Sequence, residues 1–585
     1  MSTAVSTRLQ RLASRISRRK MISGMDDLLQ TRLKRSLSTF DITLLGIGHM
    51  IGSGIYVISP EAARKAGPAC VISYVIAGIA SMLAALAYAE FAVRFPRAGS
   101  SYSYVYFSVG EFVAFIVGWN VLLENTLALS IVAQTCGAYI DSITNYVVSN
   151  FVRENVGRLV AMPANSVNTS RSGVTGLVTY LNTEHQFLVL VLMAVFVVIV
   201  LLKASRTLLV GNVLCGLSIC LLIIIIGIGI FKGNFYNWTN SNTGGFLARG
   251  WQGVFNAASI CFFSYGGFDA ISAAAEEAKD PRRSMPIATI IAMLIVTMLY
   301  TAVAGCLTLL RNWTQIRMTD GFPEAMNYNG IYWAQYIITA GALCGMTAVA
   351  VVTLYTVVRI SFSMAEDGLI CPLFAKISKR SQVPQYSTLM FAGFSALVAM
   401  FFNTDTTVDM LSIGTLTAYM MVTCGLISNR FTGTSNLSAL RLRYFRRFES
   451  HLSIIFNQRT YIFSNLIIII LTSFGMSFFI QGLWTDSTYG SPILLSLLLV
   501  TSTILLAVLQ EVPDPYQSYK MPLMPWLAVV SLVFDSVLIS TLPSVTWIRF
   551  LVWLTIGTIL YATYGLRHSK LEMNKDYPIS ANETS

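Results

Sequence analysis

Charged residues are scarce in this chain. Only 12% of its 585 residues are Asp, Glu, Lys or Arg, and 55% are hydrophobic, whereas soluble domains carry about a quarter charged residues. The chain has no Cys/His cluster and no G-x-S-x-G elbow, and its glycine-rich stretch has the wrong spacing, and no preceding strand, for a dinucleotide fingerprint. These absences exclude a soluble protein and argue against an enzyme, a metal centre or a bound cofactor.

Cysteines are missing from the long outer loops. All nine lie in, or at the edge of, apolar segments, at Cys70, Cys136, Cys215, Cys220, Cys261, Cys306, Cys344, Cys371 and Cys424. Reading a disulfide framework requires paired cysteines in an extracellular setting. We therefore expect no such framework, and no disulfide-linked heavy chain as a partner.

Apolar runs long enough to cross about 30 Å of hydrocarbon recur along the whole length. They lie at 40–58, 70–94, 106–140, 186–203, 207–231, 251–275, 286–310, 329–363, 386–402, 408–430, 460–483, 491–510, 523–542 and 547–566. The sequence therefore predicts an all-α polytopic membrane protein of about 14 transmembrane helices, with the lipid bilayer as its surroundings.

The net charge of +12 follows the topology and is not a nucleic-acid signal. With a cytosolic N-terminus, the inner segments hold 29 of the 40 Lys and Arg, the outer segments hold 10, and Arg359 lies inside a span. This bias is the positive-inside pattern. It predicts that both termini are cytosolic.

Residues 1–39 form a basic arm with nine Lys or Arg and no acidic residue before Asp26. A mitochondrial transit peptide has this composition, and so does an arm held at an anionic inner leaflet. The arm runs from Arg35 directly into the first span, which favours the second interpretation. We find no cleavable secretory signal and expect the first span to direct insertion. Three N-x-[ST] sites fall outside in this topology and are predicted to be glycosylated, at Asn168, Asn237 and Asn312.

The first span contains G-I-G-H-M-I-G-S-G at 46–54. Each glycine there costs about 1 kcal/mol of helix stability relative to alanine. An opened helix in a bilayer survives only where it lines a cavity or meets protein, and discontinuous helices build the substrate sites of many secondary transporters. The alternative is a glycine face for close helix packing. His49 lies within the stretch, and a packed donor is the simpler interpretation of it than a proton relay.

The sixth span repeats the interruption. Phe263-Ser-Tyr-Gly-Gly-Phe-Asp269 places two glycines and an acid in mid-membrane. Two glycine-interrupted spans, five apart, predict an inverted repeat of five plus five helices with a site between them. The predicted division is the arm at 1–39, the ten-helix core at 40–430, a cytosolic basic loop at 431–459, helices 11–14 at 460–566 and a cytosolic tail at 567–585.

Ionisable residues inside spans usually face a cavity or a partner. Here they are Glu90, Glu124, Asp269, Arg359 and Asp535. Four acids against one base leave negative charge that a cationic substrate would balance. The alternative is that Glu90 and Asp269 lie near a membrane face and hold cytosolic loops, Arg94 or Lys279. Glu124 lies deeper, and its alternatives are a pair with Arg359 or packing away from the cavity.

The chain resembles the cationic amino-acid transporter family of the amino acid–polyamine–organocation superfamily over nearly its full length. The shared motifs include Y-A-E-F-A-V-R-F-P-R-A-G-S-S-Y at 88–102, G-F-D at 267–269 with E-E-A-K-D-P at 276–281, M-A-E-D-G-L at 364–369 and Y-K-M-P-L-M-P at 519–525. The resemblance implies a LeuT-like fold with a 5+5 inverted repeat plus four C-terminal helices. It also implies a substrate carboxylate held by amides of Ile51, Ser53 and Gly54, and a substrate ammonium held by carbonyls of Phe263, Ser264 and Gly266.

The resemblance further implies that Thr353 lines the side-chain pocket. Glu124 stands where the best-known animal members have a small polar residue, and its depth in an apolar stretch predicts that it faces the same pocket. His49-Met50 replaces the small polar pair of the animal cationic carriers, and Ser218 stands where proton-coupled bacterial relatives have a lysine. The expected function is facilitated, potential-driven uptake of L-arginine, lysine or ornithine at the plasma membrane. The alternatives are a neutral amino-acid carrier, including a lysosomal one, and a non-transporting amino-acid sensor on the same fold.

Overall fold

The computed structural model is helical. It describes residues 37–56, 58–96, 99–144, 186–201, 204–317, 321–378, 383–402, 404–432, 458–482, 490–509 and 519–570, together with the single positions 18, 35, 147 and 511. Most of the predicted N-terminal arm, residues 433–457 of the predicted basic loop, residues 571–585 of the predicted tail and Asn168 lie outside the described residues. An isolated parallel bridge joins Leu37 to Ala278.

Each predicted span coincides with a helix or a set of short helices. In chain order these are α3, α4 and α5 (Thr39–Met50, Ser53–Tyr56 and Ile58–Ala66), α6 (Cys70–Arg94), α8 (Glu111–Ile143), α11 (Gln186–Val200), α12 (Ala204–Lys232), α14 with α15 (Gly250–Ser264 and Phe268–Ala273), α16 (Pro281–Leu310), α18 (Tyr332–Glu366), α19 (Gln385–Phe401), α20 (Thr404–Thr432), α22 (Gln458–Gly482), α23 (Gly490–Ala507), α24 (Trp526–Ser540) and α25 (Ser544–Leu560).

Among the described residues, nine helices are long and apolar enough to cross a membrane, and four further apolar helices are shorter. This confirms a polytopic membrane protein. The count of fourteen crossings stays a prediction.

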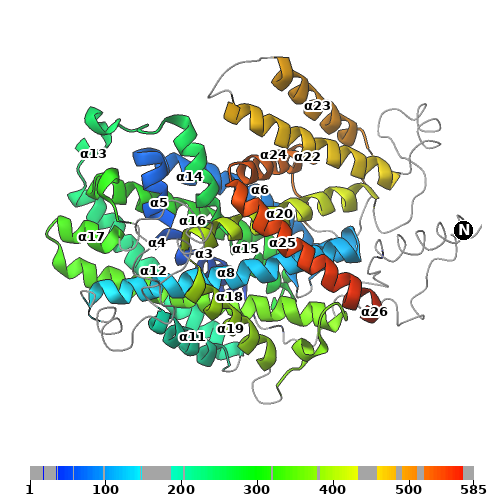
Figure 1. Cartoon of the computed structure of the whole chain (residues 1–585), viewed down its shortest axis with the longest axis horizontal. Coiled ribbons are helices and arrows are strands. Elements are labelled where there is room, and N and C mark those ends of the chain that lie inside the picture. The colour runs from blue at the N-terminus through cyan, green and yellow to red at the C-terminus, as the bar shows by residue number, and fades with distance from the viewer. Residues whose placement is uncertain are drawn as a thin grey trace, which may run out of the picture.

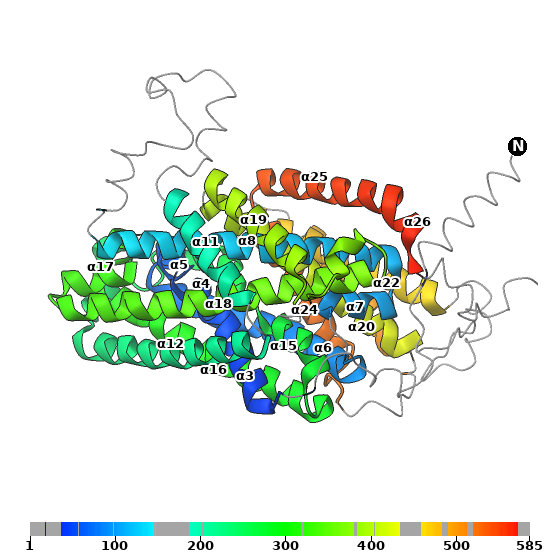
Figure 2. The ribbon, with the colours of Figure 1, turned by 90° about the horizontal axis from the view of Figure 1, so that it is seen from below.

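The long helices run along one axis in layers. Figure 2 shows α25, α8, α18 and α12 following one another across the molecule, and neighbouring members of this series are in contact. A short helix, α17 (Gly321–Tyr328), lies at one end of this axis, and α26 (Leu566–His568) lies at the opposite end (Figures 1 and 2). On the cytosolic side of the predicted topology, α7 (Ser100–Ser108) joins α6 to α8.

The interrupted helices lie in the middle of the bundle (Figure 1). The most apolar windows of Gly250–Glu277 and of α20 are 83% buried, whereas that of Ser544–His568 is 22% buried. Helices with so little burial present most of their apolar surface outward, as a lipid-facing helix must. The interrupted helices and α20 therefore form the core, and α25 lies at its edge.

The two interrupted helices pack against each other and run in opposite directions. The first half of one, α3, contacts the second half of the other, α15, and α4 and α5 contact α14. The two breaks consequently lie next to each other. Helices α22, α23 and α24 add to this core from one side, with α24 against α6 and α20, and with the α22–α23 hairpin against α24 (Figure 1), whereas α25 packs on α8 and α20.

Candidate substrate site between two interrupted helices

The first helix breaks at Ile51 and Gly52. Ile51 leaves the helical region with ψ of 102°, and its N–H still donates to Ile47 O at 2.8 Å. A Cβ on Gly52 would lie 3.0 Å from Gly345 O of α18. Glycine is therefore required at this point for close packing on α18, as well as for the break.

The second helix breaks at Gly266 and Gly267. Gly267 has a φ of 136°, a backbone conformation that residues other than glycine rarely adopt. A Cβ there would also lie 3.1 Å from the His49 ring. The chain therefore turns at Gly267 and approaches the first break at the same residue.

Hydrogen bonds join the two breaks. Ser264 Oγ donates to Gly54 O at 2.8 Å, and the Tyr300 hydroxyl shares its one hydrogen between Ser264 O, at 3.0 Å, and Met50 O. A Cβ on Gly54 would lie 2.7 Å from Ser264 Cα. Gly54 therefore belongs to a close helix contact, so the packing interpretation of the glycines holds at this position alongside the break.

The backbone groups predicted to bind substrate lie at this junction. Ile51 N–H is engaged with Ile47 O, and Phe263 O accepts from Gly266 N–H at 2.9 Å. Ser53 and Gly54 begin α4, and the first amides of a helix have no partner within it. The assignment of these groups to carboxylate and ammonium stays a prediction.

Two predicted acids lie together beside the breaks. Glu124 on α8 and Asp269 on α15 are 8% and 5% exposed, and each is close enough for electrostatic interaction with the other and with Tyr419. Glu124 also lies beside the Thr415 hydroxyl. The junction therefore carries two buried carboxyl groups.

His49 spans the space between three elements. Its Nε2 lies 2.9 Å from Thr353 Oγ1 on α18, and its Nδ1 lies 3.3 Å from Gly267 O. Asp269 also interacts electrostatically with the ring. Thr353 is fully buried, and its hydroxyl hydrogen-bonds His49 in this conformation. The interpretation of His49 as a packed group agrees with this geometry.

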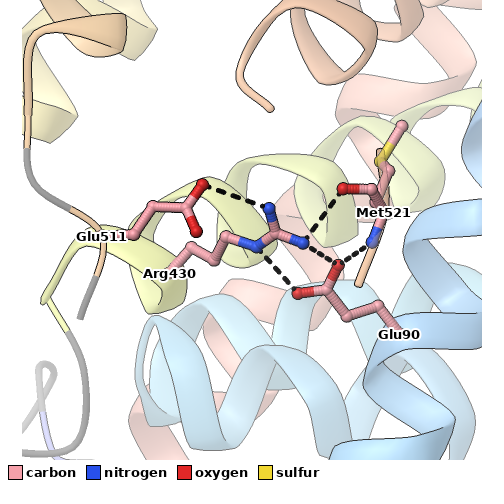
Figure 3. Close-up of polar contacts among 4 residues, drawn as sticks. All are labelled: Glu90, Arg430, Glu511 and Met521. Carbon is pink, nitrogen blue, oxygen red and sulfur yellow. Dashed lines mark hydrogen bonds and ion pairs between the residues drawn. The ribbon is translucent and has the colours of Figure 1, made fainter. Parts of the chain in front are cut away.

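Glu90 is paired away from the breaks (Figure 3). Arg430 of α20 donates from Nε to Glu90 Oε1 at 3.1 Å and from Nη2 to Oε2 at 2.7 Å, and Met521 N–H donates to the same Oε2. Arg430 also contacts Met521 O and Glu511. Burial raises the pKa of nearby Tyr519 to about 12, so this phenol is uncharged at neutral pH. Sequence reasoning named Glu90 but missed Arg430 as its partner.

Arg359 is paired as well, but not with Glu124. Its Nη2 lies 2.6 Å from Glu277 Oε1, the same oxygen that accepts from Tyr355 OH. Asp535, on α24, is fully buried, and its oxygens have no hydrogen-bond partner among the described residues. It interacts with Tyr419 and Cys424 of α20, at the contact between α20 and α24.

The remaining predicted positions are placed as follows. Ser218 of α12 is fully buried, and its Oγ lies against Gly345. Asn237 Nδ2 donates to Leu309 O at 2.8 Å, and Asn312 accepts from Thr314. Glycosylation of either stays a prediction. The described part of the chain holds no group of three or more metal-ligating side chains.

Two interrupted helices joined at their breaks, in a largely apolar helical bundle, define a membrane carrier of the discontinuous-helix class. An amino acid permease family model matches residues 37–480, and the model of the C-terminus of this permease family matches 519–569. The chain belongs to the amino acid permease family, and it is a transporter and not an enzyme.

Individual relatives cover nearly the whole chain. It is 32% identical to cationic amino acid transporter 4 of Homo sapiens, over 97% of this chain and 93% of that protein. It is 31% identical to the methylthioribose transporter and 30% identical to the branched-chain amino acid permease BcaP, both of Bacillus subtilis, in each case over 92% of this chain and 95% of the relative. The expected resemblance to cationic amino-acid transporters is confirmed.

Proposed function

We propose that this chain moves cationic amino acids, L-arginine, lysine or ornithine, across a membrane by alternating access at the junction of the two breaks. The substrate carboxylate binds at the amides of Ile51, Ser53 and Gly54. Its α-ammonium binds at the carbonyls of Phe263, Ser264 and Gly266. An anion suits the amides that begin a helix, and a cation suits the carbonyls that end one.

The observation that carries this proposal is the charge balance at the junction. Glu90 pairs with Arg430, and Arg359 pairs with Glu277. The charges of Glu90 and Arg359 are therefore balanced within the protein. Glu124 and Asp269 are buried and interact electrostatically with each other, and Asp269 also interacts with His49 at the first break. An ionised acid inside a bilayer needs a counter-charge, and the side chain of a cationic amino acid supplies one.

The backbone hydrogen bonds indicate which of the predicted groups are available to bind substrate. Ile51 N–H already donates to Ile47 O, so the amides of Ser53 and Gly54 carry most of the carboxylate binding in this conformation. Ser264 O accepts from Tyr300 and keeps a second lone pair for an ammonium. Thr353 hydrogen-bonds His49, whose other ring nitrogen contacts Gly267 O at the second break.

A neutral amino-acid carrier is the second candidate. The relatives include a branched-chain amino acid permease at nearly the same identity as the cationic one. His49 beside Asp269 offers a positive charge from within the protein, which would balance that acid when the ligand is neutral. We place the carrier in the plasma membrane with both termini cytosolic, and the lysosomal membrane is the alternative.

Counterflow in proteoliposomes tests the proposal. Vesicles loaded with unlabelled amino acid and diluted into labelled arginine, lysine, ornithine or leucine should accumulate the three cations transiently above equilibrium. Overshoot with leucine alone would identify the neutral carrier. Saturable arginine binding without any counterflow would contradict transport and identify a sensor.

A further inference from the structure

His49 fixes the direction of two hydrogen bonds. Gly267 O can only accept, so Nδ1 carries the hydrogen of the bond at 3.3 Å. In the neutral ring, Nε2 is then an acceptor, and the Thr353 hydroxyl donates to it at 2.9 Å. The ring therefore connects α3, through the start of α15, to α18.

A second contact holds α3 to α15 at the cytosolic end of the predicted topology. Leu37 N–H donates to Glu277 O, and Lys279 N–H donates to Leu37 O, each at 3.0 Å. Residues 37 and 277–279 lie directly before α3 and shortly after α15. The two short helices are thus joined at both ends, at the break by His49 and at the other end by this bridge.

The α3–α15 pair is in turn fastened to α18 at two places. One is the His49–Thr353 hydrogen bond at the break. The other is Glu277, which pairs with Arg359 at 2.6 Å and accepts from Tyr355. The first attachment lies at the predicted substrate site, and the second lies toward the cytosolic end of the predicted topology.

We propose that His49 is a positioning residue whose bond to Thr353 holds the α3–α15 pair against α18 and so keeps the cytosolic half of the site closed. Loss of this bond frees the pair to move away from α18 and from α12. The inference rests on the proposed function only in that the chain alternates between two states, and it does not depend on which amino acid is carried.

Cys215 offers a native reporter of this movement. It lies on α12 beneath α3, where its Sγ donates to Leu44 O at 3.5 Å and its Cβ lies 3.1 Å from the position of a Cβ on Gly48. It is 1% exposed. Displacement of α3 would uncover this thiol, whereas Cys371 is already exposed and serves as the internal standard.

The experiment applies a membrane-impermeant maleimide to the cytosolic side of vesicles holding the full chain, and quantifies the adduct at each cysteine by peptide mass spectrometry. Thr353→Val keeps the volume and removes the donor. It should speed labelling of Cys215 about fivefold, the effect of one net hydrogen bond on a two-state equilibrium. His49→Asn keeps an N–H for Gly267 but cannot reach Thr353, so it should give the same rate. The double variant should be no faster than either single one.

Thr356→Val is the matched control. Thr356 lies on the same helix, and its buried Oγ1 has no partner among the described residues, so the same substitution removes no bond. Equal Cys215 rates for Thr353→Val and Thr356→Val would overturn the proposal. Cys136, buried on α8, must stay protected in every variant. Equal acceleration at Cys136 would mean general loosening and would also overturn it. Labelling needs no substrate, so these outcomes are distinct from a failure of arginine transport.

Discussion

Replacement of Arg430 by methionine should be among the most destabilising single changes in this chain. Arg430 is 5% exposed and donates two hydrogen bonds to Glu90, whose side chain is fully buried. It also donates to Met521 O at 3.1 Å, in the segment that leads into α24 (Figure 3). The pair therefore joins α6 and α20 to the C-terminal helices.

The expected magnitude follows from what the substitution leaves behind. Arg430→Met strands a buried carboxylate and should cost about 3–5 kcal/mol of stability. Glu511 is the matched comparison, because its side chain is 38% exposed and lies 3.4 Å from Arg430. Exposed pairs are worth about 0–1 kcal/mol, so Glu511→Gln should be nearly neutral. Arg430→Lys should lie between the two, because a lysine cannot reproduce the bidentate geometry.

Thermal stability of the detergent-solubilised protein, followed by fluorescence-detected size-exclusion chromatography, measures this series. The double variant Glu90→Gln/Arg430→Met removes both charges and should recover part of the loss. A drop for Arg430→Met no larger than that for Glu511→Gln would refute the reasoning. A double variant less stable than Arg430→Met alone would refute it too.

Two further predictions concern the junction of the breaks. Gly54→Ala should weaken arginine binding by about 1–3 kcal/mol through overpacking, because its methyl would lie 2.7 Å from Ser264 Cα. A methyl at Gly227 meets nothing within 4 Å, so Gly227→Ala should bind arginine normally. Isothermal titration calorimetry compares the two variants, and equal arginine affinities would reject the close contact between Gly54 and Ser264. Glu124→Gln should lower arginine uptake and leave leucine uptake equal or higher, since a neutral ligand no longer leaves a charge unpaired; uptake of both per surface-expressed molecule gives the ratio, and an unchanged ratio would sink the selectivity role.

The local sequence was sufficient to predict where the helices lie and where two of them are interrupted. The second span was predicted at 70–94, and α6 occupies Cys70–Arg94, because an uninterrupted apolar run of this length leaves few alternatives in a bilayer. The breaks were predictable because glycine is a poor helix former and because four glycines fall within residues 46–54. Both signals reside in neighbouring residues.

Partners distant in sequence were not predictable in the same way. Arg430 lies 340 residues from Glu90, and Thr353 lies 304 residues from His49. Composition indicated that buried acids need partners, but only packing decides which base reaches which acid. Thr353 was predicted to line the side-chain pocket, and the fold shows its hydroxyl bound to His49. No local sequence pattern predicts this interaction.

The most direct test of a cation carrier is accumulation driven by membrane potential alone. In proteoliposomes clamped with potassium and valinomycin at 100 mV, inside negative, with no pH or sodium gradient, a carried monovalent cation gains about 2.3 kcal/mol. We expect roughly fifty-fold accumulation of arginine under these conditions, in agreement with the prediction from Ser218 that transport needs no proton gradient. Absence of arginine accumulation at clamped potential, or its appearance only when a proton gradient is added, would contradict it.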